Sequence, residues 1–284
     1  MTEIKYVSSD GKEYNFNCNN VKLTETSFHK HSWNITTSKG RKNKLFNKVE
    51  LEPAIYEILV VVRGTLEERT AFVNSFIDSA DRDVLVNIQS TIFVNNMYAK
   101  GFFTSIESCA KENKGCWSEL KLNFYCPEAV WVTEKTYEFL KQEDDELKAD
   151  VTLPEKGMVF KEFEFDFLKK KGEAVVDNSE SISDTDFVMK IYGFVDTPKV
   201  IINEHQYVVN TTLYDGERIE INSKEGTIIK IGRLGETTNL YNARGKEQSV
   251  FKKIPKGIHM VAWSGGFGFD LTLKNERSEP RWNV

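Results

Sequence analysis

The chain has 284 residues, of which 40% are hydrophobic and 29% charged, a composition typical of a globular protein with one large or two ordinary domains. The formal net charge is -5, and the lysines and arginines are scattered, which argues against a dedicated nucleic-acid-binding protein. The N-terminus lacks the apolar stretch of a signal peptide, and no run reaches the length of a transmembrane helix. We therefore expect synthesis and folding in a cytoplasm, and no membrane partner.

Cysteine usage excludes a disulfide-stapled fold. Cys18, Cys109, Cys116 and Cys126 are too few for a scaffold of this size, and no two of them form a Cys-x-x-Cys pair. We expect buried, reduced thiols rather than disulfides.

One helix is expected, over residues 65–79. Thr65 and Glu68 have the spacing of a capping box, in which each side chain accepts a hydrogen bond from the other residue's backbone amide. An apolar stripe at helical spacing follows, made of Leu66, Val73, Phe76 and Ile77. After the charged residues 81–83, the run Val-Leu-Val-Asn-Ile at 84–88 predicts a strand.

Elsewhere, short alternating segments predict antiparallel strands. Residues 117–126, 161–167 and 266–273 each place apolar side chains on one face and polar ones on the other. The predicted inward-facing residues are Leu120, Leu122, Phe124 and Cys126, then Phe163, Phe165 and Phe167, then Phe267, Phe269, Leu271 and Leu273. Asp215-Gly216 predicts a hairpin turn, and residues 224–226 predict another turn.

The charged segment 133–150 is interpreted as a linker or short helical crossing. We place a domain boundary near residue 135. The predicted fold is mainly β: residues 1–134 form a split-barrel or sandwich-like domain with one helix, and residues 135–284 form a galectin-like or carbohydrate-binding-module-like β-sandwich.

The search for reactive groups finds no catalytic, cofactor-binding or metal-binding constellation, and no cofactor is expected. His29 and His31 could share a metal from one side of a strand, but such a pair without a nearby carboxylate or thiol is more often a surface pair. Asp184 and Asp186 lack the glycine and glutamate of a calcium loop.

Two further groups of residues, acidic residues and tryptophans, have side chains suited to carbohydrate chemistry. Glu162, Glu164 and Asp166 could hydrolyse glycosides, although carboxylates spaced by two are more often a solvated strand face. The five tryptophans could stack on sugars, although packing in a core or an interface is more common: Trp33, Trp117, Trp131, Trp263 and Trp282.

The C-terminal half carries a resemblance to a known family. An Ile-Tyr-Gly opening at 191–193 is followed by Thr197-Pro198, by a Gly-Glu-x-Ile-x-Ile-Asn strand at 216–222 and by Asn239 and Tyr241. The ending has the residues Ser249, Phe251, Ile254, Pro255, Gly257 and Trp263. In this order and spacing the segment resembles the C-terminal domain of siphophage distal tail proteins.

The N-terminal half is similar to the same family at residues 60–83, 98–105 and 122–131. The resemblance implies a hexameric ring that joins the tail tube protein to the tail-tip hub protein and the receptor-binding apparatus. It also implies that DNA crosses the lumen only in transit, that the protein is a non-enzymatic component of the virion's tail tip, and that synthesis takes place in the bacterial host cytoplasm. The residues at the ring interface are not identified by the sequence.

Three alternatives remain at this point. The sandwich could be a carbohydrate-binding module that adheres to the host surface, or the same ring could belong to a phage-tail-like bacteriocin. The third is a glycoside hydrolase acting through Glu162 or Glu164.

Overall fold

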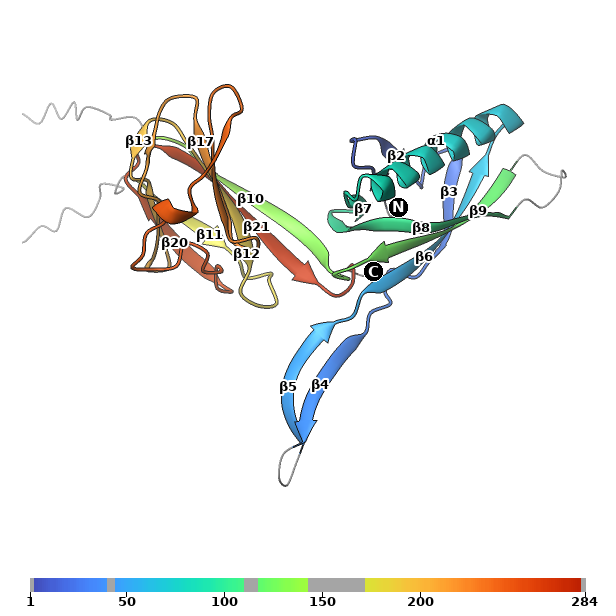
Figure 1. Cartoon of the computed structure of the whole chain (residues 1–284), viewed down its shortest axis with the longest axis horizontal. Coiled ribbons are helices and arrows are strands. Elements are labelled where there is room, and N and C mark those ends of the chain that lie inside the picture. The colour runs from blue at the N-terminus through green and yellow to red at the C-terminus, as the bar shows by residue number, and fades with distance from the viewer. Residues whose placement is uncertain (1–2, 40–43, 110–116, 143–171, 282–284) are drawn as a thin grey trace, which may run out of the picture. The chain divides into compact units, whose positions relative to one another are not determined.

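The computed structural model describes residues 3–39, 44–109, 117–142 and 172–281 (Figure 1). The chain divides into two compact units, one made of Met1–Glu134 with Glu276–Val284, and the other of Lys135–Asn275. The fold is mainly β, as predicted, with antiparallel sheets in both units and a single α-helix among the described residues. The predicted strand at 161–167 lies outside the described residues.

The first unit is built from antiparallel strands around an aromatic-rich core. Its elements are β1 (Ile4–Val7), β2 (Glu13–Asn15), β3 (Val21–Thr26), β4 (Trp33–Lys39), β5 (Lys44–Leu51), β6 (Ala54–Arg63), α1 (Leu66–Leu85), β7 (Ser90–Val94), β8 (Met97–Cys109), β9 (Trp117–Cys126) and β10 (Trp131–Phe139), which ends in the second unit. The strands pair in the order β2-β1-β7-β8 and, through β8, in the order β8-β9-β6-β3.

Strand β8 belongs to both of these sets because it changes partner midway. Its first residues, from Met97 to Gly101, pair with β7, and the residues from Phe102 onward pair with β9, with a register shift between Phe103 and Ser105. A Cβ on Gly101 would lie 2.1 Å from the carbonyl oxygen of Tyr125, so the crossing requires glycine. The bulge bends the strand, which lets the two sets enclose one core.

Helix α1 starts as predicted. The Thr65 side chain accepts from the Glu68 amide, and Glu68 accepts from the Thr65 amide at 2.9 Å, so the capping box is confirmed. The predicted stripe is only partly right. Phe76 is fully buried and Val73 packs against the core, but Leu66 at the first turn is 69% exposed.

The strand predicted at 84–88 is wrong. The helix continues to Leu85, and its last turn is held by Asp83, which is 1% exposed and accepts from the Ser9 amide at 2.8 Å. Arg82 in the same turn interacts favourably with the negative end of the helix dipole. The apolar run that suggested a strand therefore lies at the end of a helix.

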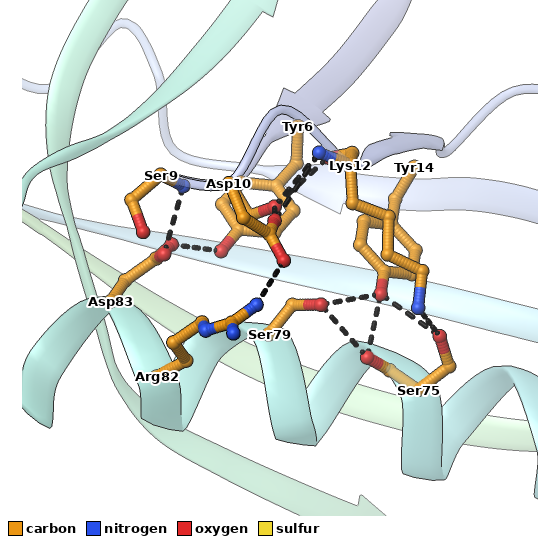
Figure 2. Close-up of polar contacts among 10 residues, drawn as sticks. Tyr6, Ser9, Asp10, Lys12, Tyr14, Ser75, Ser79, Arg82 and Asp83 are labelled. Atoms are coloured by element: carbon orange, nitrogen blue, oxygen red, sulfur yellow. Dashed lines mark hydrogen bonds and ion pairs between the residues drawn. The ribbon is translucent and has the colours of Figure 1, made fainter.

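A polar network fastens α1 to the loop between β1 and β2 (Figure 2). Tyr6 donates to the Asp83 carboxylate, and Tyr14 donates to the backbone carbonyl of Ser75 at 2.6 Å. Arg82 pairs with Asp10 at the exposed rim. Burial and the Asp83 carboxylate raise the pKa of Tyr6, so this phenol stays a neutral donor at physiological pH. The network positions α1, and the buried carboxylate of Asp83 is engaged in its hydrogen bonds.

The second unit is a two-sheet sandwich. Its elements are β11 (Glu173–Asp177), β12 (Asp186–Tyr192), β13 (Val195–Asp196), β14 (Lys199–Ile202), β15 (His205–Val208), β16 (Thr212–Leu213), β17 (Arg218–Asn222), β18 (Thr227–Ile231), β19 (Thr237–Asn239), the 3-10 helix η1 (Tyr241–Ala243), β20 (Ile258–Trp263) and β21 (Gly268–Arg277), which ends in the first unit. One sheet has the order β19-β18-β17-β12-β21 and the other β11-β20-β14-β15. The predicted faces of 117–126 in the first unit and 266–273 in the second are confirmed, because the residues predicted to face inward are at most 1% exposed.

Two expectations for the second half change, and a third holds. Residues 133–139 lie in strand β10 rather than in a linker or helix, and residues 143–150 lie outside the described residues. Asp215-Gly216 forms a turn, but β16 pairs with β13 and β17 pairs with β12 and β18, so the turn joins two sheets instead of a hairpin. The turn at 224–226 does join a hairpin, β17–β18.

The predicted second domain ended at residue 284, whereas residues 276–284 group with the first unit. The backbone amide of Arg281 donates to the Met97 sulfur at 3.4 Å, a contact within that unit. We expect residues 135–275, expressed alone, to fold as a sandwich with a cooperative thermal melt, because their buried side chains form a separate core. A fragment that melts without cooperativity, or folds only beside residues 1–134, would contradict this boundary.

Buried tyrosines predict alkaline instability. Tyr56 is fully buried, and this burial raises the pKa of its phenol to about 12. The unfolded phenol ionises near pH 10, so the stability from Tyr56 is complete below pH 10 and is lost between pH 10 and about 12. Urea unfolding across this pH range measures the loss, which should be roughly 2–3 kcal/mol for this residue.

Tyr56→Phe provides the comparison for this measurement. The variant should be less stable at neutral pH, because the Trp131 indole N–H donates to the Tyr56 hydroxyl at 3.0 Å and loses its acceptor. Its stability should nevertheless fall less steeply between pH 10 and 12. Equal slopes for the two proteins would place the alkaline sensitivity elsewhere.

Candidate assembly surfaces

A projecting hairpin in the first unit has an uncovered apolar face. Among the described strands, β4 and β5 pair only with each other, and Figure 1 shows them extending away from β6. Trp33 lies opposite Leu51 and Ile35 opposite Val49, so alternation puts these four on one side. Ile35 is 60% exposed, and Trp33 and Val49 are exposed as well.

The other face of this hairpin is polar. It carries Asn34, Thr36, Lys48 and Glu50, with an ion pair between Lys48 and Glu50. A two-stranded hairpin is marginally stable in water unless its apolar side packs on something. The hairpin therefore has the pattern of an arm that is completed by a partner.

A second apolar surface lies at the end of α1. Val84, Leu85, Val86 and Ile88 are all exposed, Leu85 to 84%. Val84 and Leu85, together with Asp81, Phe103 and Thr104, line a depression of about 410 Å³. Contiguous apolar surface of this kind marks protein contacts. We call the four exposed residues Val84, Leu85, Val86 and Ile88 the helix-end patch. In the sequence, these residues are part of the run that predicts a strand at 84–88.

The histidine pair has a different setting from the one considered. His29 and His31 lie between β3 and β4 rather than on a strand. Their Nδ1 atoms lie 3.8 Å and 3.7 Å from the same carboxylate oxygen of Glu279, a residue remote in sequence. Among the described residues, no group of three or more histidines, cysteines and acidic residues is placed to hold a metal ion. This arrangement places Glu279 of the C-terminal segment next to the loop between β3 and β4 in the first unit.

Several other residues considered for chemistry in the sequence lie outside the described part of the chain, and the structure shows where the rest lie. Glu162, Glu164, Asp166, Cys116 and Trp282 lie outside the described residues, as does the side chain of Cys109. Asp186 is buried and pairs with Lys253 at 2.7 Å, whereas Asp184 is exposed.

The other tryptophans and cysteines divide by burial. Trp131 and Trp263 are core residues, and Trp33 and Trp117 are exposed. Cys126 is a buried free thiol, as expected, and burial raises its pKa; Cys18 is also a free thiol but is exposed, so the expected burial is wrong for Cys18. In the part of the chain that is described, no helix is long and apolar enough to span a bilayer.

Comparison with solved structures places this fold. A chain of the phage P2 baseplate in its activated conformation with Ca matches with a TM-score of 0.62 at 13% identity, covering 99% of this chain and 100% of that one. The phage p2 baseplate in its activated conformation with Sr gives a TM-score of 0.63, also at 13% identity, with coverage of 99% and 100%. SPP1 Dit, described as a paradigm of the hub adsorption apparatus in phages that infect Gram-positive hosts, gives 0.58 at 10% identity, covering 98% and 99%.

No protein-family model and no curated protein sequence matches the chain. The chain has the fold of these phage baseplate and hub proteins over its whole length, so the resemblance to distal tail proteins is confirmed at the level of the fold. At identities of 10% and 13% few residues are shared, so the resemblance in the sequence rested on short motifs that are individually weak but occur in a characteristic order.

Proposed function

We propose that this protein is a structural hub of a phage tail, a distal tail protein whose copies close into a ring between the tail tube and the tail-tip hub with its receptor-binding proteins. Synthesis in the host cytoplasm and final residence at the tip of the virion follow from this role. The fold of the baseplate and hub structures supports it. The likeness to structural baseplate proteins also favours a non-enzymatic role.

The observation that carries the ring is the exposed apolar face of the β4–β5 hairpin. The first unit has two separate apolar surfaces, this hairpin and the helix-end patch, and they differ in shape and residues. When one surface of a chain binds a different surface of the next copy, the contact is head-to-tail. Head-to-tail contacts that close on themselves give a ring. We assign the hairpin of one subunit to the helix-end patch of the next.

Native mass spectrometry of the full chain tests this proposal. Six copies give about 196 kDa, six times the 32.7 kDa of one chain. The mass should hold on dilution to the micromolar range, because the contact buries apolar surface on both partners. A monomer at all concentrations would contradict the proposal, and a closed ring of another size would correct the subunit number.

We expect the ring's channel to be a passive conduit for DNA. Each phosphate contact adds affinity that has to be broken again as DNA passes. Six chains together carry a formal charge of -30, six times -5, without a basic stripe in the sequence. Double-stranded DNA should therefore not bind the purified ring in low salt, where attraction is least screened. Salt-sensitive micromolar binding would overturn this expectation.

A phage-tail-like bacteriocin would use the same ring and satisfy the same tests. Neighbouring genes separate the two cases, because a phage also encodes a capsid. A glycoside hydrolase would instead turn over cell-wall polysaccharide, and the carboxylates considered for that chemistry, Glu162 and Glu164, lie outside the described residues.

A further inference from the structure

A polar groove of about 780 Å³ lies in the second unit on the solvent side of strands β14 and β15. Val200 and Tyr207 point into the core, so the alternate residues Lys199, Gln206 and Val208 face outward into the groove. The opposite wall is the segment 242–248. The groove is thus formed by a rigid sheet and one loop.

Backbone contacts fix this loop against the sheet. The Gly245 amide donates to the Val208 carbonyl at 2.8 Å, and the Asn210 amide donates to the Ala243 carbonyl at 2.7 Å. A Cβ on Gly245 would lie 3.2 Å from the Val208 Cβ, so glycine allows the close approach. The Gln206 amide donates to the Gln248 side-chain oxygen at 2.6 Å, which ties the far end of the loop. A fixed groove costs less ordering when it binds a ligand.

The charges in the groove favour an anion. Lys199, Arg244 and Lys246 line it with a single acidic residue, Glu247, giving a formal charge of +2 in a chain of -5. Within the described part of the chain, neither lysine forms an ion pair. These cations are therefore available to bind an anion. A group of three positive charges stands out in a chain whose net charge is negative.

Arg244 is held in place by aromatic stacking. Its guanidinium lies 4.0 Å from the centroid of the Tyr241 ring and donates to the Tyr241 carbonyl at 2.7 Å. Tyr241 in turn stacks on Phe251, with centroids 6.0 Å apart. Tyr241 thus packs against Arg244 and Phe251, and no aromatic residue is among those that line the groove, so the lining offers no platform for stacking a neutral sugar. An oriented guanidinium instead presents a donor fork for a phosphate or carboxylate.

Side-chain amides supply the remaining polar lining. Gln206, Asn210, Asn242 and Gln248 offer donors and acceptors to hydroxyl groups. Since Gln248 uses its oxygen on the Gln206 amide, its NH2 group is left as a donor. A lining that combines cations with amides matches a ligand that carries both anions and hydroxyls.

We propose that this groove binds an anionic, hydroxyl-rich polymer of the bacterial surface, either a polyol phosphate or an acidic polysaccharide. The three cations contact its phosphate or carboxylate groups, and the four amides contact its hydroxyls. This gives the second unit a recognition role of its own, which does not require the ring to form.

Isothermal titration calorimetry in low salt tests the proposal on the full chain. The probes are poly(glycerol phosphate), polygalacturonate, neutral dextran and double-stranded DNA. One or both of the first two should bind, and the stronger of them identifies the anion. Dextran should not bind, because the groove has no free aromatic face. DNA should not bind measurably, as expected for the ring, because its phosphodiester backbone carries no free hydroxyls.

Three variants assign the binding to the groove. Lys199→Gln with Lys246→Gln should weaken binding roughly tenfold or more and reduce its salt dependence. Lys252→Gln with Lys256→Gln removes the same charge from exposed lysines that do not line the groove and should leave binding unchanged. Asn242→Ala keeps the charge and should weaken binding by a few fold.

Several outcomes overturn the proposal. These are no binding of either anionic polymer, equal binding of DNA, or equal losses in the groove and control lysine pairs. A loss confined to the lysine pair, with Asn242→Ala unchanged, would also overturn it, because it would reduce the groove to a general polyanion site. A monomeric mass in the assembly experiment would leave this result unaffected, so the two proposals fail separately.

Discussion

Replacing residues 33–51 by Asn-Gly should convert the proposed ring to monomers. The ends of the hairpin are already joined across its base, where the Glu52 amide donates to the Ser32 carbonyl at 2.9 Å, so a two-residue turn closes the gap. The body of the first unit should fold normally, because β4 and β5 pair with none of its other strands. Native mass spectrometry measures the change in assembly, and circular dichroism checks the fold.

Point variants separate the apolar face from the mere presence of the hairpin. Ile35→Ser with Val49→Ser should dissociate the ring, because these paired residues lie on the apolar side. Thr36→Ala with Lys48→Ala changes a pair on the opposite side and should leave the ring intact. If the second pair dissociates the ring as completely as the first, the apolar face is not the contact.

Mixing tests the assignment of the hairpin to the helix-end patch. Leu85→Ser should also give monomers, because Leu85 is the most exposed residue of that patch. The hairpin-less chain keeps its patch and the Leu85 variant keeps its hairpin. A mixture of the two should therefore form a dimer with one intact contact and grow no further. A mixture that stays monomeric would show that the hairpin binds elsewhere.

The periodic parts of the fold could be predicted from the sequence. The alternation in 117–126 and 266–273, and the capping box at Thr65, are local patterns, and each is confirmed. The end of the helix could not be predicted in this way. Val84, Leu85, Val86 and Ile88 form an apolar run typical of a strand, whereas the helix continues to Leu85. Its last turn is held by contacts of Asp83 with Tyr6 and Ser9, which are remote in sequence.

The candidate surfaces depend on similar nonlocal information. A sequence does not distinguish an apolar residue that faces its own core from one that faces a partner, so Ile35 and Leu85 carried no visible signal. The groove residues lie in two segments, Lys199–Asn210 and 242–248, which come together through hydrogen bonds between residues remote in sequence, such as Gly245 to Val208. Glu279 likewise meets His29 only in the folded chain.

Replacing Phe76 with alanine should destabilise the protein by about 3–5 kcal/mol, because the residue is fully buried at the centre of an aromatic cluster. Its ring contacts five others, with centroids between 5.1 Å and 6.4 Å away: Tyr6, Tyr14, Phe16, Phe72 and Phe103. These rings come from the N-terminal strands, the helix and β8, so the cavity would disconnect α1 from the sheet.

Leu66→Ala on the same helix is the matched control. Leu66 belongs to the same apolar stripe in the sequence but is 69% exposed, so its loss should change the free energy of unfolding by less than about 0.5 kcal/mol. Urea unfolding of the two variants, compared at a concentration where the assembly state is the same, measures the difference. Similar, small effects for both residues would mean that α1 is peripheral to the core of the first unit. A large effect for Leu66 alone would instead place its side chain in a subunit contact.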